Sequence, residues 1–275
     1  MTTMTTTPTT ATAGAPTAPL GRRTPPAPIP LSRIVAVEAR KTFDTRSGFW
    51  LLTSIGITAL LATVAVVLWA PDSELTYDTF AAAIGFPMAV ILPMVAILAV
   101  TSEWSQRSGL TTFTLVPHRN RVVLAKAIVA VAIAVGSMVL AMVIGAVGNI
   151  VGSTIAGVDT VWDDGPMHLS TIVLGNVLGL LVGFMLGVLI RNSAGAIVTY
   201  FVWSFVLPTA AGLLAANQGW FRDLQPWVDF NYAQSALFNG SVTAEQWAQV
   251  GVTSLVWLVV PLAVGVRMVL RSEVK

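Results

Sequence analysis

The sequence contains no cysteine, which excludes disulfides, thiolate metal sites and cysteine nucleophiles. Charge is also scarce, because only 10% of the residues are Asp, Glu, Lys or Arg. No segment matches the Gly-x-x-x-x-Gly-Lys-Ser/Thr pattern that wraps nucleotide phosphates, so the chain carries no ATPase motif of its own. The Gly-x-Ser-x-Gly pattern of serine hydrolases is missing as well. We therefore assign no catalytic residue and no metal ligand from motifs.

Apolar residues make up 55% of the chain and gather in six long runs. Each run is near or above the roughly 20 residues that an α-helix needs to cross a bilayer. The runs cover residues 49–70, 80–100, 127–156, 169–190, 194–216 and 247–266. They predict an all-α, polytopic membrane protein with six transmembrane helices. The third run is longer than a bilayer requires, so we expect it to be tilted, or broken near Gly145, Gly148 and Gly152.

The charged residues between the runs predict an orientation. When the runs are threaded alternately through a membrane, all of the 15 Lys and Arg residues except Arg222 fall on one side. The positive-inside rule places that side in the cytoplasm, together with both termini. The opposite side carries acids, among them Asp72, Asp78, Asp159, Asp163, Asp164, Asp223, Asp229 and Glu245. Membrane topology thus explains the basic residues, and we expect no nucleic-acid partner.

The runs themselves contain no Asp, Glu, Lys or Arg. Ion-coupled carriers commonly hold such side chains within the membrane to relay the coupling ion. Backbone carbonyls beside Pro87, Pro93 and Pro208 offer another way to bind an ion, so a secondary transporter is kept as an alternative.

Two segments precede the first run. Residues 1–30 are rich in Thr and Pro and poor in large apolar side chains, a composition that predicts a disordered tail. Residues 31–46 place Leu31, Ile34 and Val35 among basic and acidic residues, which predicts an amphipathic helix on the inner membrane surface. A solvated juxtamembrane stretch is the alternative. Residues 31–275, which include this amphipathic segment, are predicted to form one six-span membrane domain.

The predicted inner loop 101–126 is the most distinctive segment. It begins with the acidic Glu103, continues through a Thr-rich stretch, and reaches Leu115, Pro117 and Arg121 before Lys126 opens the third run. This order resembles the ABC-2 type permeases, the membrane subunits of ATP-binding cassette transporters, most of which are exporters. The six-span plan, the basic helix before the first run and the long outer segment after the fifth run fit the same family.

The resemblance implies that this loop is a coupling helix, which docks into a cleft of a separate cytoplasmic P-loop ATPase. Two copies of that ATPase would bind ATP and Mg²⁺, whereas this chain needs no cofactor of its own. A second permease chain, identical or different, would complete the transporter in a bacterial inner membrane. A loop whose aromatics merely lie at headgroup level is the alternative. The docking residues would be Glu103, Trp104, Gln106, Arg107, Phe113, Pro117, Arg119 and Arg121.

Two further patterns predict packing and interfacial positions. Gly175, Gly179, Gly183 and Gly187 recur every fourth residue and expose backbone along one helix face. Another helix should pack closely there, within the same chain or across a dimer. The outer segment 217–246 is rich in aromatic residues, which predicts short helices at the outer membrane interface. They serve either as a gate or as a simple anchor. The aromatic residues are Trp220, Phe221, Trp227, Phe230 and Tyr232.

The substrate path is expected along weakly polar faces of the spans, and we assign Met88, Asn149, Tyr200 and Trp203 to it. Without charge in the runs, the cargo should be hydrophobic or amphipathic, such as a drug, lipid or peptide. A membrane-embedded lipid or sugar transferase, with a divalent metal on Asp159, Asp163 and Asp164, is the alternative from another class.

Overall fold

The computed structural model describes residues 29–105 and 119–271 of the chain. The described residues form helices, and their one β pairing is an isolated parallel bridge between Thr76 and Val161. Six helices or unbroken helix series are long and apolar enough to cross a membrane. They are Gly48–Trp69, Tyr77–Ser102, Asn120–Ala156, Pro166–Ile190, Ser193–Asn217 and Ala244–Arg271. The prediction of an all-α chain with six membrane-length helices is confirmed.

The helices follow one another along the chain with short connections. The first half contains α1 (Leu31–Asp44), α2 (Arg46–Trp69), η1 (Asp72–Glu74), α3 (Tyr77–Ser105), α5 (Arg119–Ala156) and α6 (Pro166–Ile190). The fifth span is the series α7 (Ser193–Phe201), η2 (Val202–Val206) and α8 (Leu207–Asn217). Then come α9 (Gly219–Val228), α10 (Phe230–Ser235), η3 (Ala236–Phe238), and the sixth span α11 (Ala244–Ser254), η4 (Leu255–Val259) and α12 (Val260–Arg271).

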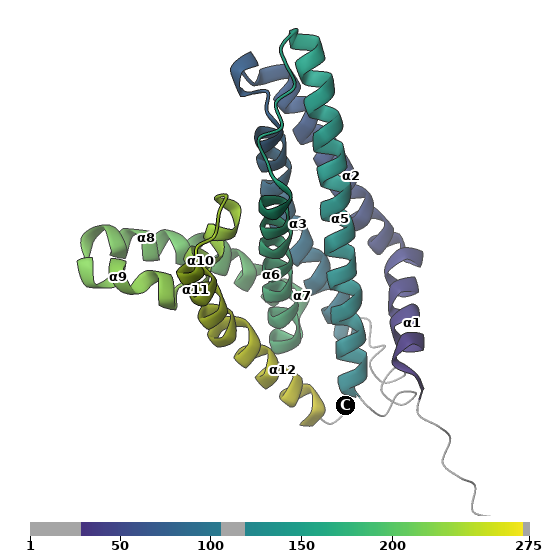
Figure 1. The fold of residues 1–275 in the computed structure, drawn as a ribbon. Helices are drawn as coiled ribbons and strands as arrows, with labels where there is room; N and C mark the ends of the chain where they lie inside the picture. The colour runs from purple at the N-terminus through teal and green to yellow at the C-terminus, as the bar shows by residue number, and fades with distance from the viewer. Residues whose placement is uncertain (1–28, 106–118, 272–275) are drawn as a thin grey trace, which may run out of the picture.

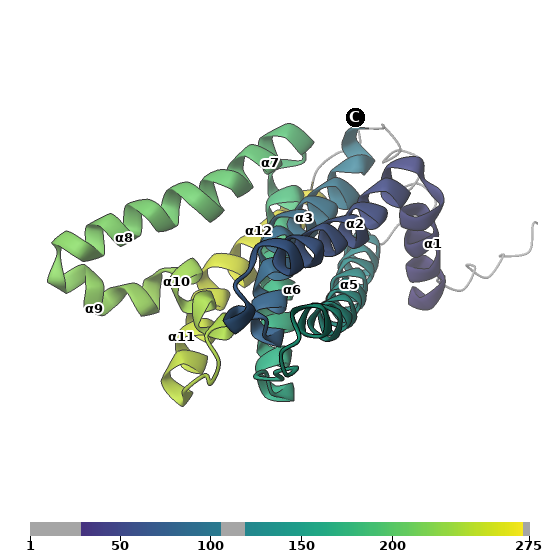
Figure 2. The ribbon, with the colours of Figure 1, turned by 90° about the horizontal axis from the view of Figure 1, so that it is seen from above.

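Helix α6 lies in the middle of the bundle, with α3 and α5 beside it and α2 and α1 toward one edge (Figures 1 and 2). The largest hydrophobic core joins these helices through Met88 and Leu92 of α3 and Leu180 and Phe184 of α6. All four side chains are almost completely buried. The core therefore sits where the second, third and fourth spans meet.

Helix α5 is continuous through all three glycines at which we expected a possible break. Of the two alternatives, tilted or broken, the break is wrong, and the contacts of Gly148 give the reason. A Cβ there would lie 2.3 Å from the Thr63 methyl group of α2 and 3.0 Å from the Phe80 ring of α3. The glycine is needed for the close approach of three helices, and the helix does not have to bend.

The basic end of the bundle holds a buried ion pair. Glu38 of α1 is 5% exposed, and its carboxylate lies 2.6 Å from the Nζ of Lys126 and 2.8 Å from the Nζ of Lys41. Lys126 was expected in the loop before the third span, but α5 begins at Arg119 and carries Lys126 inside the packed bundle. The ion pair ties α1 to α5.

Two π-helical turns interrupt the last two spans, and each is followed by a proline. In η2 the Leu207 N–H donates to the Val202 carbonyl, and Pro208 comes next; in η4 the Val260 N–H donates to Leu255, and Pro261 comes next. A proline has no N–H and its ring collides with the carbonyl four residues earlier. A wider turn moves that carbonyl aside, which explains both positions.

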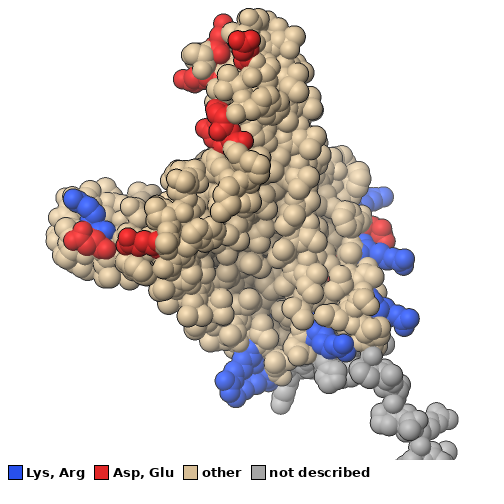
Figure 3. Space-filling view, in the orientation of Figure 1, with Lys and Arg blue, Asp and Glu red and all other residues tan. Residues whose placement is uncertain are grey.

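The fifth span leaves the bundle instead of joining it. Helices α7 and α8 run outward, and α9 returns beside α8 to form an arm (Figures 1 and 2). Figure 3 shows Lys and Arg toward one end of the molecule, with some acidic atoms among them, and Asp and Glu gathered at the other end, with a third, mixed charged group on the arm. This group includes Arg222 and Asp223 of α9. The segregation of charge along the bundle follows the pattern on which the predicted orientation depends.

Candidate functional site

A cavity of about 450 Å³ opens at the root of the arm, where α3 and α6 meet the fifth span and the segment after it. Its walls are mostly apolar, with a few amide and hydroxyl groups. They consist of Phe86, Ala89 and Val90 of α3, Gly175, Asn176, Gly179 and Val182 of α6, Tyr200, Trp203, Ser204, Phe205 and Pro208 of the fifth span, and Asn231, Gln234, Ser235 and Phe238. Cavities of this size and polarity are typical of sites for small organic molecules.

Proline chemistry fixes one wall of the cavity. Pro93 has no N–H, so the carbonyl of Ala89, four residues earlier in α3, lacks its helical donor. The Tyr200 hydroxyl donates to that carbonyl at 2.7 Å. Pro93 also lies against Gly183 of α6, where a Cβ would come within 2.7 Å of the proline carbonyl oxygen. The proline therefore positions both α6 and the tyrosine.

Aromatic rings form the wall toward the arm. Trp203 lies in η2, and its ring centroid is 5.3 Å from that of Trp257 in η4 and 6.2 Å from that of Phe230. Trp257 is anchored by a 2.7 Å hydrogen bond from its indole N–H to the Val228 carbonyl. The two π-helical turns thus face each other through their tryptophans.

Small residues and amides form the wall on α6. A Cβ on Gly175 would lie 2.5 Å from the Phe238 ring, so the bare backbone lets the aromatic residue pack there. Gln234 donates to the Gly175 carbonyl at 2.7 Å. Asn176 is 3% exposed and donates to the Ile172 carbonyl, while its Oδ1 has no partner among the described residues. A buried acceptor without a donor is costly, so Asn176 adds a strained polar position to this wall.

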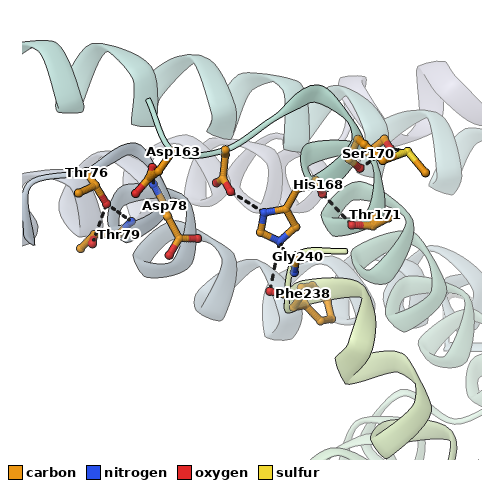
Figure 4. A network of polar contacts seen from close by, with 11 residues as sticks. Thr76, Asp78, Thr79, Asp163, His168, Ser170, Thr171, Phe238 and Gly240 are labelled. Carbon is orange, nitrogen blue, oxygen red and sulfur yellow. Dashed lines mark hydrogen bonds and ion pairs between the residues drawn. The ribbon is translucent and has the colours of Figure 1, made fainter. Parts of the chain in front are cut away.

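A second group of polar residues lies at the acidic end, where α3 and α6 begin (Figure 4). Asp163 accepts a hydrogen bond from the Asp78 N–H at 2.9 Å, and Asp164 Oδ1 lies 2.5 Å from His168 Nδ1. His168 Nε2 lies 3.1 Å from the Gly240 nitrogen and 3.3 Å from the Phe238 oxygen. One ligand atom each of Asp78, Asp164 and His168 can be chosen so that all lie within 4.8 Å of one another. These residues form the candidate metal group.

The predicted coupling loop is described only at its two ends. Gln106, Arg107, Phe113 and Pro117 lie outside the described residues, as do the side chains of Glu103 and Arg119. Trp104 is partly buried against the main core, and the guanidinium of Arg191 lies 5.9 Å from its ring centroid. Arg121 donates to the Ile29 carbonyl at 2.8 Å. Both described members of the set therefore make contacts within this chain.

Arg191 lies at the same end of the bundle, in the connection between α6 and α7. Its backbone has a φ of 56°, a left-handed conformation that ends α6. Its Nε and Nη2 are buried without a partner among the described residues. Desolvation by burial lowers the pKa of this arginine from its ordinary value. The Trp104 ring compensates part of that desolvation by a cation–π contact.

The predicted substrate-path residues lie in different places. Tyr200 and Trp203 line the cavity, whereas Met88 is completely buried in the main core. Asn149 is buried in α5, where it donates to the Val161 carbonyl at 2.8 Å. It is not among the cavity residues.

The aromatic segment 217–246 contains α9, α10 and η3, and its rings differ in exposure. Phe230 is 2% exposed and packs on Trp203. Trp220, Trp227 and Tyr232 are exposed, and Phe221 packs edge-on against Trp220.

The glycine face of α6 contacts elements of the same chain: Gly175 and Gly179 face the segment 234–238, and Gly183 and Gly187 face α3. A single helix face thus supports both the cavity and the core.

Sequence reasoning missed the candidate metal group. It selected Asp159, Asp163 and Asp164, but Asp159 is exposed and Asp163 bonds a backbone N–H, so only Asp164 belongs to the group. Asp78 lies two residues before the predicted run 80–100, and His168 lies one residue before the predicted run 169–190, so each directly precedes a span. That shared position was the available signal. Their distance could not be read from the chain because 90 residues separate them.

The sequence matches no protein-family model and has no significant match among curated proteins. The resemblance to ABC-2 permeases therefore rests on the order of residues and spans in this chain alone.

Proposed function

We propose that this chain is the membrane-spanning subunit of an ATP-binding cassette exporter, driven by a separate cytoplasmic ATPase. The cavity is the observation that carries the proposal. It is mostly apolar, it holds no ionised side chain in its lining, and it places Tyr200, Trp203 and Asn176 around one space. Such a lining suits an amphipathic molecule with a hydrogen-bond donor.

The inner end provides the second support. The buried pair of Glu38 and Lys126 holds α1 against α5, and Trp104 and Arg191 hold the end of α3 against the connection between α6 and α7. Trp104 and Lys126 lie near the two ends of the predicted coupling segment 101–126. A partner that moves the loop would therefore move α3 and α5, and α3 lines the cavity.

Co-purification tests the partner. The tagged chain is extracted from its native membranes, the bound proteins are identified, and ATP hydrolysis is measured in lipid nanodiscs. We expect a stoichiometric P-loop ATPase that is lost in Glu103→Arg and in Arg107→Glu. Asp223→Arg, a charge reversal on the arm, is the control and should retain it. A chain that purifies alone from its native membranes and supports no ATP hydrolysis would contradict the proposal.

Filling the cavity tests the substrate site. Gly179 lines the cavity and a Cβ there meets only the Gln234 amide at 3.5 Å, whereas Gly212 of α8 has nothing within 4 Å and is not a cavity residue. Gly179→Leu should reduce export of an amphipathic dye such as ethidium at least about tenfold, because the side chain occupies the binding volume. Gly212→Leu should leave export unchanged. Equal export by both variants would remove the cavity from the proposed path.

A metal-dependent transferase is a second candidate, favoured by the candidate metal group of Asp78, Asp164 and His168. It predicts that the isolated chain transfers a lipid-linked or sugar group only with a divalent cation and without an ATPase. Failure of added ATPase to affect turnover would favour it over the exporter.

A further inference from the structure

The candidate metal group brings together three segments that are far apart in the sequence. Asp78 lies in the first turn of α3, Asp164 lies in the loop before α6, and His168 lies in the first turn of α6. Asp163 holds the start of α3 in place through the Asp78 N–H, and the Thr76–Val161 bridge fixes the loop beside it. The backbone thus presents two carboxylates and an imidazole to one point.

Asp164 supplies an independent sign that a ligand belongs there. Its side chain is only 4% exposed. Oδ1 is bonded to His168, but Oδ2 is buried and has no partner among the described residues. Leaving a carboxylate oxygen dry and unpaired is costly, because the charge loses its hydration and gains nothing in return. A cation coordinated by this oxygen would remove that cost.

His168 has partners for either state of its ring. With the proton on Nδ1, the ring donates to Asp164, and Nε2 accepts from the Gly240 N–H. With a cation on Nδ1, the proton moves to Nε2, which then donates to the Phe238 carbonyl. A metal-bound histidine ordinarily donates its other ring N–H to a carbonyl or carboxylate in this way. The second partner is therefore already in place.

We propose that Asp78, Asp164 and His168 bind a divalent transition-metal cation of the Zn²⁺ type, with water completing its coordination. One imidazole and two carboxylates suit Zn²⁺ better than Mg²⁺ or Ca²⁺, which take oxygen ligands almost exclusively. The bound ion links α3, α6 and the turn at 238–240, next to Phe238 of the cavity wall. The proposal does not depend on what the chain transports.

The distances between the ligand atoms of the three residues must change slightly before all of them can bind one ion. Two ligands at about 2.1 Å from one Zn²⁺ lie at most about 4.2 Å apart, and the group spans up to 4.8 Å. Asp78 is exposed, so a change of its side-chain torsions can bring it in. The Asp164–His168 contact of 2.5 Å must in turn open to admit the ion.

Calorimetric titration tests the site. The full chain is purified with a tag that lacks histidine, treated with EDTA, dialysed, and titrated with ZnCl₂ in detergent. We expect one Zn²⁺ per chain, with Mg²⁺ giving no heat at the same concentration. Asp164→Asn and His168→Gln should weaken binding by more than about tenfold. Asp159→Asn, an exposed acid of the same loop, is the matched control and should bind as the unaltered chain does.

Zinc K-edge absorption spectroscopy supplies the second readout. The imidazole signal should be present in the unaltered chain and in Asp159→Asn, and absent in His168→Gln, whose folding is checked by helical circular dichroism. A chain that binds no Zn²⁺ at about 100 µM, binding unaffected by Asp164→Asn, or preference for Mg²⁺ would each overturn the proposal. If zinc binds while the ATPase partner is never found, this inference stands and the proposed function fails.

Discussion

Glu38, at the basic end of the bundle, should be costly to replace. Glu38→Gln removes the carboxylate that lies 2.6 Å from the ammonium of Lys126, a side chain that is 8% exposed. Breaking a buried ion pair from one side costs about 3–5 kcal/mol. We expect a clear fall in the thermal unfolding midpoint in detergent.

The control is Lys41→Gln, because Lys41 contacts the same carboxylate but is 43% exposed. Loss of one partner of an exposed ion pair lowers the free energy of unfolding by at most about 1 kcal/mol. A double variant, Glu38→Leu with Lys126→Leu, should recover part of the midpoint by replacing the pair with apolar contacts. Equal midpoints for Glu38→Gln and Lys41→Gln would show that the buried pair does not hold α1 in place.

Tyr200 and Pro93 should be coupled energetically, although they lie in different helices. Tyr200→Phe leaves the Ala89 carbonyl without its donor, which should destabilise the chain by about 1–2 kcal/mol. In a Pro93→Ala background the introduced alanine has an N–H that can bond that carbonyl, so the same change should cost clearly less. A double-mutant cycle of unfolding midpoints measures the difference. Additive effects would mean that the proline does not create the need for the hydroxyl.

At the scale of helices, the glycine face of α6 makes a graded prediction. Gly183→Ala places a methyl group within 2.7–2.9 Å of Pro93 backbone and ring atoms, where nothing flexible can move away. Overpacking of this kind costs about 1–3 kcal/mol. Gly179→Ala meets only the end of Gln234 at 3.5 Å, and should be neutral or stabilising because alanine favours helix. Yield and monodispersity in detergent should separate the two variants.

If Gly183→Ala and Gly179→Ala give equal yield and monodispersity, the packing of α3 against α6 at Pro93 is loose enough to admit a methyl group. Gly187→Ala should fall between them, because its Cβ would meet the Val100 side chain at 3.3 Å.

Long apolar runs were enough to predict the helices. The six spans differ from the predicted runs mainly at their ends, because polar residues such as Lys126 and Asp78 continue a helix once it packs. The continuity of α5 was not predictable, because the glycine pattern does not say whether a helix breaks or admits a neighbour. The π-helical turn of η2 depends on how Pro208 is accommodated, which local sequence leaves open.

The sites were predictable only in part. Tyr200 and Trp203 were selected as weakly polar residues in an apolar run, and they line the cavity. Asn176, with its unpaired oxygen, was not selected, because its importance arises from burial beside the arm. The candidate metal group was missed for a similar reason, since Asp78 meets His168 only through tertiary packing.

At the scale of the whole molecule, the bundle and the arm differ in how much of their surface is buried within the chain. The bundle buries its core around α6, whereas the fifth span is the least buried of the six. Its exposed apolar residues include Phe205, Leu207 and Leu213. The cavity lies at the root of this arm, so a movement of the arm would change the cavity directly.

The segregation of charge in Figure 3 leads to the last prediction, which the absence of cysteine makes simple to test. Single cysteines are introduced at Asp72 and Asp159 on the acidic end and at Arg40 and Arg267 on the basic end. All four positions should react with a maleimide in detergent. In intact cells, a membrane-impermeant maleimide should label only Asp72→Cys and Asp159→Cys, because basic segments are retained in the cytoplasm. Labelling of Arg40→Cys and Arg267→Cys instead would invert the orientation, and it would place the loop 101–126 where no ATP-driven partner could reach it.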